Sequence, residues 1–351
     1  MRLRSHHLLL CLGLACSEPG LDTTIVKTTS GTGTTTQGSG GSSTTFDVEP
    51  PEPHLWTVSA EYGEDVGAIF SIWADGPGSI IAVGGQPLQG VALEYVDETW
   101  VRVTDLPEPV PRLNWIHGVG EMRVAVGYYG VVLQRQDGVW EHRESGVDAP
   151  LWGVWGATED DLWAVGGGGP EGSPILLHDD GDGWSEVDVS GLVGQSNALF
   201  KVWGRSADDV YAIGSGGLIL HYDGATWRAQ ASLTGSTLIG IAGDDDEVVV
   251  AGGRSSGVVL RQIDGEWRRL AFPEDEGFDG AWIDGEGFPT VVGRRGFIGL
   301  LAADGVAWTR EESGVTHELH TIIGVPGGPV FAVGGHFDSA PYTGVILRRL
   351  P

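Results

Sequence analysis

Basic residues are scarce in this chain, and their scarcity excludes whole classes of partner. Only 20 Lys and Arg stand against 48 Asp and Glu in 351 residues, so the formal net charge is −28. Such a chain repels phosphate backbones and anionic lipid headgroups, which excludes electrostatic binding to nucleic acid or to an anionic membrane surface. Basic partners and divalent cations remain compatible with this charge.

Cysteine is also scarce, and long apolar runs are missing. Arg2 and Arg4 precede a seven-residue apolar run at 8–14, which ends at Leu14-Ala15-Cys16. The run is too short to span a bilayer, and its layout predicts a secretory signal peptide over residues 1–15. Cys11 would leave with that peptide, so the mature chain would hold one cysteine and no internal disulfide.

A cysteine at the end of such a run resembles the lipobox of bacterial lipoproteins. The resemblance implies that Cys16 is acylated and becomes the new N-terminus, so that a lipid anchor makes the sole membrane contact. Ser17 in the next position implies sorting to the outer membrane, with the membrane side left open. The alternative is an ordinary signal peptide that is cleaved nearby.

Residues 16–53 are predicted to form a lipidated cysteine followed by a disordered tether. The segment 23–45 is almost entirely Thr, Ser and Gly, and prolines follow at 50, 51 and 53. This composition cannot bury enough apolar surface to order itself. As a flexible coil the tether would span about 35 Å, or it could serve as a glycosylated stalk.

From residue 54 onward the chain repeats about every 42 residues. One series places a tryptophan after an Asp or Gly turn, and a second places a glycine after a short apolar strand. Each series has seven members, which are Trp56, Trp100, Trp140, Trp184, Trp227, Trp267 and Trp308, and Gly84, Gly127, Gly166, Gly214, Gly252, Gly293 and Gly334. This period with strand-length apolar runs predicts an all-β, seven-bladed β-propeller over 54–351.

One repeat illustrates the four strands of a blade. The pattern predicts strands at 199–203, 210–213, 218–222 and 227–230, separated by Asp- and Gly-rich hairpin turns. The last repeat lacks its fourth strand, whereas Trp56 lies in an extra strand before the first repeat. Residues 54–58 are therefore expected to complete the last blade and close the ring. Nearly all tryptophans are then expected to pack between blades.

The repeat resembles known propeller families. The segments Val202-Trp203-Gly204, Asp209 to Gly214, Ile219 to Gly224 and Trp227 resemble repeats of bacterial envelope lipoproteins with sialidase-like (BNR, Asp-box) or photosystem-assembly-factor-like propellers. The first repeat also resembles a Kelch repeat through Gly84-Gly85, Tyr95 and Trp100. These motifs are specific for architecture and carry little information on function, because propellers serve as enzymes, lectins and scaffolds.

The sequence predicts no catalytic residues. It lacks Gly-x-Ser-x-Gly, His-Glu-x-x-His and a phosphate-binding loop. A sialidase-like enzyme is the alternative, for which Arg254, Arg294 and Arg295 would have to gather with a Tyr and Glu pair at the axis. No metal site and no cofactor are expected, and His178 and His221 occupy equivalent positions that are interpreted as an exposed face. Acidic turns such as 244–247 leave a weak possibility of structural calcium.

The candidate binding face carries the loops from each fourth strand to the next blade and the loops from each second strand to the third. Exposed aromatics beside arginines are typical of interface anchors. The residues predicted to lie there are Tyr128, Tyr129, Arg254, Arg294, Arg295, His336, Phe337 and Tyr342. The sequence thus predicts a monomeric, non-enzymatic propeller tethered in the bacterial cell envelope, which binds a protein or a glycan. The alternatives are a carbohydrate-active enzyme and an assembly factor for an envelope complex.

Overall fold

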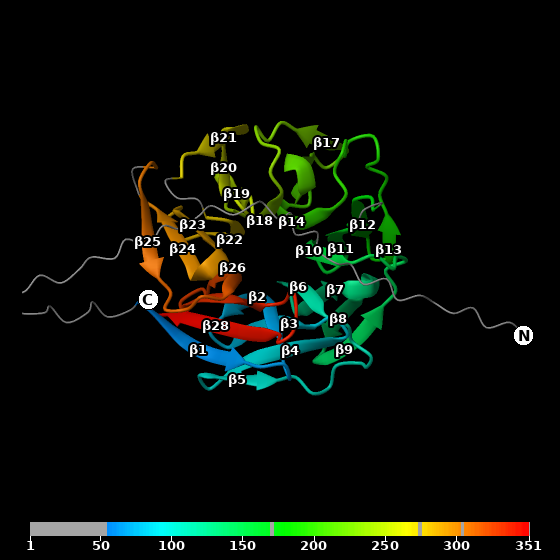
Figure 1. The fold of residues 1–351 in the computed structure, drawn as a ribbon. Helices are drawn as coiled ribbons and strands as arrows, with labels where there is room; N and C mark the ends of the chain where they lie inside the picture. The colour runs from blue at the N-terminus through cyan, green and yellow to red at the C-terminus, as the bar shows by residue number, and fades with distance from the viewer. Residues whose placement is uncertain (1–54, 169–171, 273–275, 303–304, 351) are drawn as a thin grey trace, which may run out of the picture. The chain divides into compact units, whose positions relative to one another are not determined.

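The chain forms a ring of seven antiparallel sheets, each with four strands (Figure 1). The computed structural model describes residues 55–168, 172–272, 276–302 and 305–350. The predicted all-β, seven-bladed propeller is confirmed. The predicted signal peptide, Cys16 and the tether lie outside the described residues. In the described part of the chain, no helix is long and apolar enough to cross a bilayer.

The first three blades follow the chain from the innermost strand outward. They comprise β2 (Ala68–Gly76), β3 (Ser79–Gln86), β4 (Gln89–Val96) and β5 (Thr99–Arg102); β6 (Leu113–Val119), β7 (Met122–Gly127), β8 (Val132–Gln136) and β9 (Val139–Arg143); and β10 (Leu151–Thr158), β11 (Asp161–Gly166), β12 (Ile175–Asp179) and β13 (Trp184–Glu186).

The next three blades repeat this order. They comprise β14 (Leu199–Ser206), β15 (Asp209–Gly214), β16 (Ile219–Tyr222) and β17 (Trp227–Gln230); β18 (Leu238–Gly243), β19 (Glu247–Gly252), β20 (Val258–Ile263) and β21 (Glu266–Leu270); and β22 (Phe278–Ile283), β23 (Pro289–Gly293), β24 (Phe297–Leu301) and β25 (Trp308–Glu312). The strands predicted for residues 199–230 agree with β14 to β17 to within three residues at each end.

The seventh blade is built from both ends of the propeller. It comprises β26 (Glu318–Gly324), β27 (Val330–His336), β28 (Thr343–Arg349) and, on its outer edge, β1 (Trp56–Tyr62). In Figure 1 the blue β1 lies alongside the red β28, and Trp56 is in register with Arg349. The predicted closure is therefore confirmed, although β1 starts two residues later and extends four residues further than expected.

A close backbone approach explains the seven-membered glycine series. Each glycine lies at or within two residues of the end of the second strand of its blade and pairs with one of the first two residues of the innermost strand. A Cβ atom there would lie 1.9–2.3 Å from the carbonyl oxygen of the residue before that partner. Any larger residue would force the two strands apart at the point where every blade begins.

Directly after that pairing, every innermost strand has a β-bulge. The register shifts by one residue between Ile69 and Ser71 in β2, and an equivalent shift follows in β6, β10, β14, β18, β22 and β26. A bulge leaves one residue out of the ladder and redirects its side chain. The same position in all seven blades is thereby turned toward the axis of the ring.

Tryptophans join neighbouring blades, as the sequence indicated. The seven serial tryptophans all lie in the outermost strands, and Trp100 of the first blade donates a hydrogen bond to Ser59 Oγ of the seventh (3.1 Å). A second set ends the innermost strands. A Cβ on Gly204 would lie 2.6 Å from the ring of Trp155 in the preceding blade, and Gly118, Gly243 and Gly324 receive Trp73, Trp203 and Trp282 in the same way.

His178 and His221 are not on a fully exposed face, which corrects that interpretation. Each lies half-buried, stacked on an aromatic ring of the neighbouring strand and bonded to a carboxylate. His178 lies 4.0 Å from the centre of Trp163 and 2.8 Å from Asp161 Oδ1. His221 lies 4.4 Å from the ring centre of Tyr211 and 2.6 Å from Asp209 Oδ1. These histidines strengthen the sheets.

The closure strand supplies a prediction about stability. Trp56 is 3% exposed, and its Nε1 donates to Glu311 Oε2 of the sixth blade at 2.7 Å. Trp56→Ala should lower the free energy of unfolding by about 3–5 kcal/mol, because a large buried ring is lost and Glu311 loses a donor. Chemical denaturation measures the change.

Two further variants separate the contribution of the Trp56 ring from that of the closing strand β1. Trp56→Phe retains most of the buried area and should cost less than Trp56→Ala. Deletion of 54–58 removes the start of β1, including Trp56, and should destabilise the whole ring by several kcal/mol. An unchanged melting temperature in that deletion would contradict the role of β1 in closing the ring.

Candidate functional site

The seven bulged residues form a ring of side chains at one end of the central channel. They line a cavity of about 340 Å³, which we call the channel mouth. Its members are Phe70, Asn114, Trp152, Phe200, Ile239, Asp279 and His320. Because each blade contributes the same backbone position, the sequence can vary these side chains without changing the sheets.

The channel mouth is divided into an apolar arc and a polar arc. Trp152, Phe200 and Ile239 come from three consecutive blades, and Asp279 and His320 come from the two blades that follow. Phe70 completes the ring by stacking on His320, with ring centres 4.9 Å apart and planes 8° apart. A ligand that enters the mouth would therefore meet a hydrophobic wall opposite ionisable groups.

Arg112 lies beside the mouth as a buried guanidinium group between aromatic rings. Its Cζ lies 3.9 Å from the ring centre of Tyr128 and 4.4 Å from that of Phe70, and its Nε donates to Asn114 Oδ1 at 3.0 Å. Burial lowers the pKa of Arg112. Cation–π contacts of this kind are strong when the cation is desolvated, so Arg112 holds Tyr128 and Phe70 in place.

Lys201 follows Phe200 in β14 and also lines the channel mouth. Its Nζ donates to the carbonyl oxygens of Trp152 (2.9 Å) and Phe200 (3.2 Å) and lies 4.3 Å from the ring centre of Trp115. Burial lowers the pKa of Lys201 to about 7, against the opposing effect of Asp279. This lysine is therefore close to losing its proton at neutral pH.

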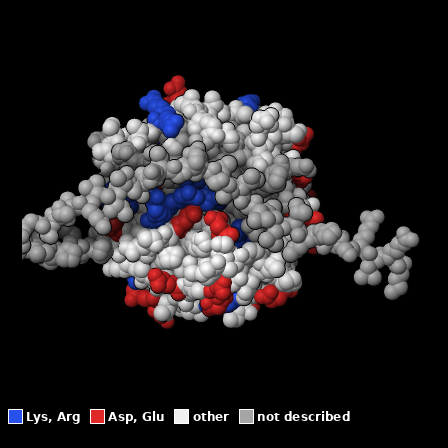
Figure 2. Space-filling view, viewed as in Figure 1, with Lys and Arg blue, Asp and Glu red and all other residues white. Residues whose placement is uncertain are grey.

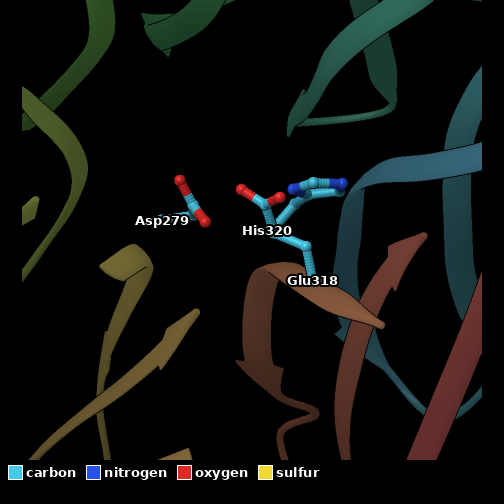
Figure 3. A group of neighbouring side chains, drawn as sticks. All are labelled: Asp279, Glu318 and His320. Atoms are coloured by element: carbon cyan, nitrogen blue, oxygen red, sulfur yellow. The ribbon is translucent and has the colours of Figure 1, made fainter. Parts of the chain in front are cut away.

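Asp279, Glu318 and His320 meet on the polar side of the mouth (Figure 3). One ligand atom from each residue lies within 4.8 Å of the other two. Burial, together with the charge of Glu318 and a hydrogen bond between the carboxyl groups, raises the pKa of Asp279 well above its usual value. Burial also opposes ionisation of Glu318, but the Asp279 hydrogen bond, His320 and Arg254 outweigh it and lower the pKa of Glu318.

A larger cleft adjoins the mouth across Arg254 and Glu318, which line both hollows. This arginine cleft, of about 710 Å³, is lined by Arg254, Glu276, Arg294, Arg295, Glu318 and His336 among others. Arg254 Nη2 donates to Glu318 Oε1 at 2.9 Å, and Arg295 Nη2 contacts both carboxylate oxygens of Glu276 at 2.8 and 2.9 Å. Figure 2 shows basic and acidic atoms meeting at the central hollow of this face.

Most of the residues predicted for the binding face lie around these two hollows. Arg254, Arg294, Arg295 and His336 line the arginine cleft, and Tyr128 and Phe337 line the mouth. Tyr129 is 61% exposed and lines a separate hollow of about 490 Å³ beside the second blade. Tyr342 is half-buried in the loop between β27 and β28 and contributes to the electrostatic environment of Arg112.

Tyr129 and Arg295 share an unusual backbone conformation. Each is the middle residue of a short 3₁₀ turn between the second and third strands, with φ of 56° and 53°. The equivalent residue of the fourth blade is Gly216, with φ of 67°. A side chain in this left-handed region costs free energy, which a glycine at the same place avoids.

The arginine arrangement bears on the sialidase-like alternative. Arg254, Arg294 and Arg295 do line one cleft, as that alternative requires. Two of the three guanidinium groups are bound by Glu318 and Glu276 of the protein itself. They are therefore neutralised by the protein, whereas an enzyme of that kind would present them to a substrate carboxylate.

Five residues of the channel mouth were not predicted from the sequence, namely Arg112, Lys201, Asp279, Glu318 and His320. A signal for the channel mouth existed, because each bulged residue lies 13 or 14 positions before the serial glycine of its blade. The residues at this position in the seven repeats are the whole ring of side chains at the channel mouth. Nothing in the sequence by itself indicates that the innermost strands bulge at this position and turn the side chain toward the axis.

Comparisons with known proteins agree with this fold. No protein-family profile and no curated protein matches the sequence. A solved structure of YCF48 from Cyanidioschyzon merolae is similar, with a TM-score of 0.63, 16% identity and coverage of 84% of this chain and 98% of that chain. The Neurospora crassa Pan2 WD40 domain has a TM-score of 0.61, 13% identity and coverage of 84% and 95%.

A further similar structure contains a bound peptide. YCF48 bound to D1 peptide has a TM-score of 0.51 and 16% identity, and the match covers 71% of this chain and 94% of that chain. At these identities the likeness establishes the propeller fold.

Lys201 supplies a prediction about pH. Its pKa in the folded protein is about 7, against an ordinary value of 10.5. The unfolded chain therefore binds more protons between these values, so the cost of burying Lys201 is relieved as the pH rises from about 7 to 10. The free energy of unfolding of the wild type, minus that of Lys201→Met, should increase over this interval in urea titrations. A difference that is constant with pH would contradict a neutral Lys201.

Proposed function

We propose that this protein is a non-enzymatic binding scaffold of the bacterial cell envelope. It holds a segment of a partner protein across the face that carries the channel mouth and the arginine cleft, which we call the mouth face. The observation that carries the proposal is the pair of hollows that share Arg254 and Glu318. Together they combine exposed arginines with an apolar arc, a combination typical of the central residues of protein interfaces.

The size and shape of the face favour an extended peptide segment. The arginine cleft and the channel mouth have volumes of about 710 and 340 Å³ and adjoin one another. An extended segment could place an acidic residue at the cleft and an apolar residue at the arc, and the acidic surface elsewhere would repel acidic competitors. A YCF48 propeller of similar fold has been solved with a peptide bound, which supports a protein partner over a glycan.

The envelope location rests on the N-terminal segment. Acylation of Cys16 would place the folded ring at the end of the 16–53 segment, clear of the bilayer. Two or more acyl chains anchor a protein stably, because each buried methylene contributes about 0.8 kcal/mol.

The lipid anchor can be tested with the two cysteines of the chain. Cys16→Ser should abolish incorporation of a labelled fatty acid and move the full-length protein from the membrane fraction to the soluble fraction. Cys11→Ser is the matched control and should behave as the wild type, because Cys11 would be removed with the signal peptide. Labelling that persists in Cys16→Ser would contradict the proposed anchor.

The binding face can be tested by cross-linking in intact cells. A photoreactive amino acid at Tyr129, which is 61% exposed on the mouth face, should form discrete protein adducts that mass spectrometry can identify. The matched control is Val139, 58% exposed on β9 of the same blade but away from the mouth face.

A second variant shows whether the adducts depend on the proposed site. Arg294→Ala removes an exposed lining residue of the arginine cleft and should weaken the adducts formed at position 129. The Glu121→Ala variant changes an exposed residue in the turn between β6 and β7 and should leave them intact. The same adducts from positions 129 and 139, or their insensitivity to Arg294→Ala, would overturn the proposed binding face.

A further inference from the structure

We propose that Asp279, Glu318 and His320 form a binding site for a divalent transition-metal ion of the zinc type in the polar arc of the channel mouth. Two carboxylates and an imidazole offer one ligand atom each, all within 4.8 Å of one another (Figure 3). This mixed set of nitrogen and oxygen ligands suits Zn²⁺, whereas Ca²⁺ and Mg²⁺ are bound almost entirely by oxygen.

The buried atoms without partners are the second observation that points to a ligand. Asp279 is 6% exposed and His320 is 9% exposed, so both are more than nine-tenths buried. His320 Nε2 has no hydrogen-bond partner among the described residues, and Asp279 Oδ2 has no donor there. The hydrogen bond that Asp279 shares with Glu318 needs a proton on one of the two carboxyl groups, and a metal ion would replace that proton. Buried polar atoms without partners are rare and costly, and a metal ion bound between these two residues would satisfy both.

The backbone explains why these groups meet. Asp279 and His320 are the bulged residues of the adjacent strands β22 and β26, and Glu318 is the first residue of β26. The bulges turn both side chains toward the axis, and the Glu318 carbonyl oxygen is the one that approaches Gly334. The three ligands are therefore carried by rigid sheet backbone, which suits a preformed metal site.

The surroundings of each ligand fit this role. His320 is fixed between Phe70, at 4.9 Å, and Phe337, at 5.1 Å between ring centres. Arg254 Nη2 donates to Glu318 Oε1 at 2.9 Å, and Glu318 shares a hydrogen bond with Asp279 that metal binding would replace. Outer contacts of this kind hold metal ligands in position and tune their affinity.

The geometry requires one adjustment. Ligand atoms around a tetrahedral zinc ion are separated by about 3.4 Å, given bonds of about 2.0–2.1 Å. Glu318 is the least buried of the three, and its side chain lies on the rim of both hollows. A change in its side-chain torsions would bring it onto the ion, while Asp279 and His320 stay in place.

The remaining coordination position would open toward the channel mouth. Three protein ligands leave a fourth position for water or for a donor atom of a bound partner. Within the described part of the chain, Asp279, Glu318 and His320 are the one group of three His, Asp, Glu or Cys side chains close enough to hold an ion. A single ion is therefore expected.

The test is titration of Zn²⁺ into the full-length protein after treatment with a chelator. Calorimetry should give one equivalent of Zn²⁺ bound per chain, and Co²⁺ in its place should give the visible absorption bands of a four-coordinate ion. Asp279→Asn and His320→Gln should each weaken binding by at least about tenfold. Ca²⁺ should not compete at equal concentration.

His178→Gln is the matched control, because His178 also lies beside a carboxylate, at 2.8 Å from Asp161, but away from the mouth. It should leave zinc binding unchanged. Melting temperatures measured without metal identify any variant that misfolds. If Asp279→Asn or His320→Gln misfolds, Glu318→Gln at the more exposed rim replaces it and should also weaken zinc binding. Absence of binding at millimolar Zn²⁺, or binding that survives these substitutions, would overturn the site. Cross-linking at Tyr129 is independent of metal, so failure here leaves the proposed partner face standing.

Discussion

The close approach of two backbones at the start of each blade is the constraint on which the rest of the structure depends. A glycine near the end of the second strand admits the carbonyl oxygen of the residue before its partner in the innermost strand, at a distance that no side chain would tolerate. The innermost strand then bulges by one residue. A single steric requirement, repeated seven times, thus fixes the register of each blade and turns one side chain per blade toward the axis.

The ring is held together by contacts between blades rather than within them. Ring edges of tryptophans at the ends of the innermost strands lie against glycines of the next blade, and tryptophans of the outermost strands reach back to the previous blade. β1 pairs with β28 and supplies Trp56, which contacts the sixth blade in the same way, at the point where the ring would otherwise stay open. Closure removes two unpaired strand edges, which would otherwise invite pairing with other chains.

Because the sheets do not depend on the bulged side chains, the channel mouth is free to carry ionisable groups. Asp279 and His320 are buried with unpaired atoms, and Lys201 is buried with a pKa of about 7. Each arrangement costs stability, and the costs are concentrated in one cavity next to three exposed arginines. Other blades place Phe200 and Ile239 at the position equivalent to Asp279 and His320, so the fold itself does not require ionisable groups there.

The sequence by itself determined the architecture, because the tryptophan and glycine series count the blades and the displaced Trp56 reveals the closure. It also placed Arg254, Arg294, Arg295, His336, Tyr128 and Phe337 on one face, since loops that follow equivalent strands emerge on the same side of a ring. The convergence of Asp279, Glu318 and His320 was decided only by the tertiary structure. Asp279 lies 41 residues before His320 in the chain. They meet because bulges in adjacent blades point both strands' side chains into one channel, and a bulge depends on backbone contacts that periodicity does not record.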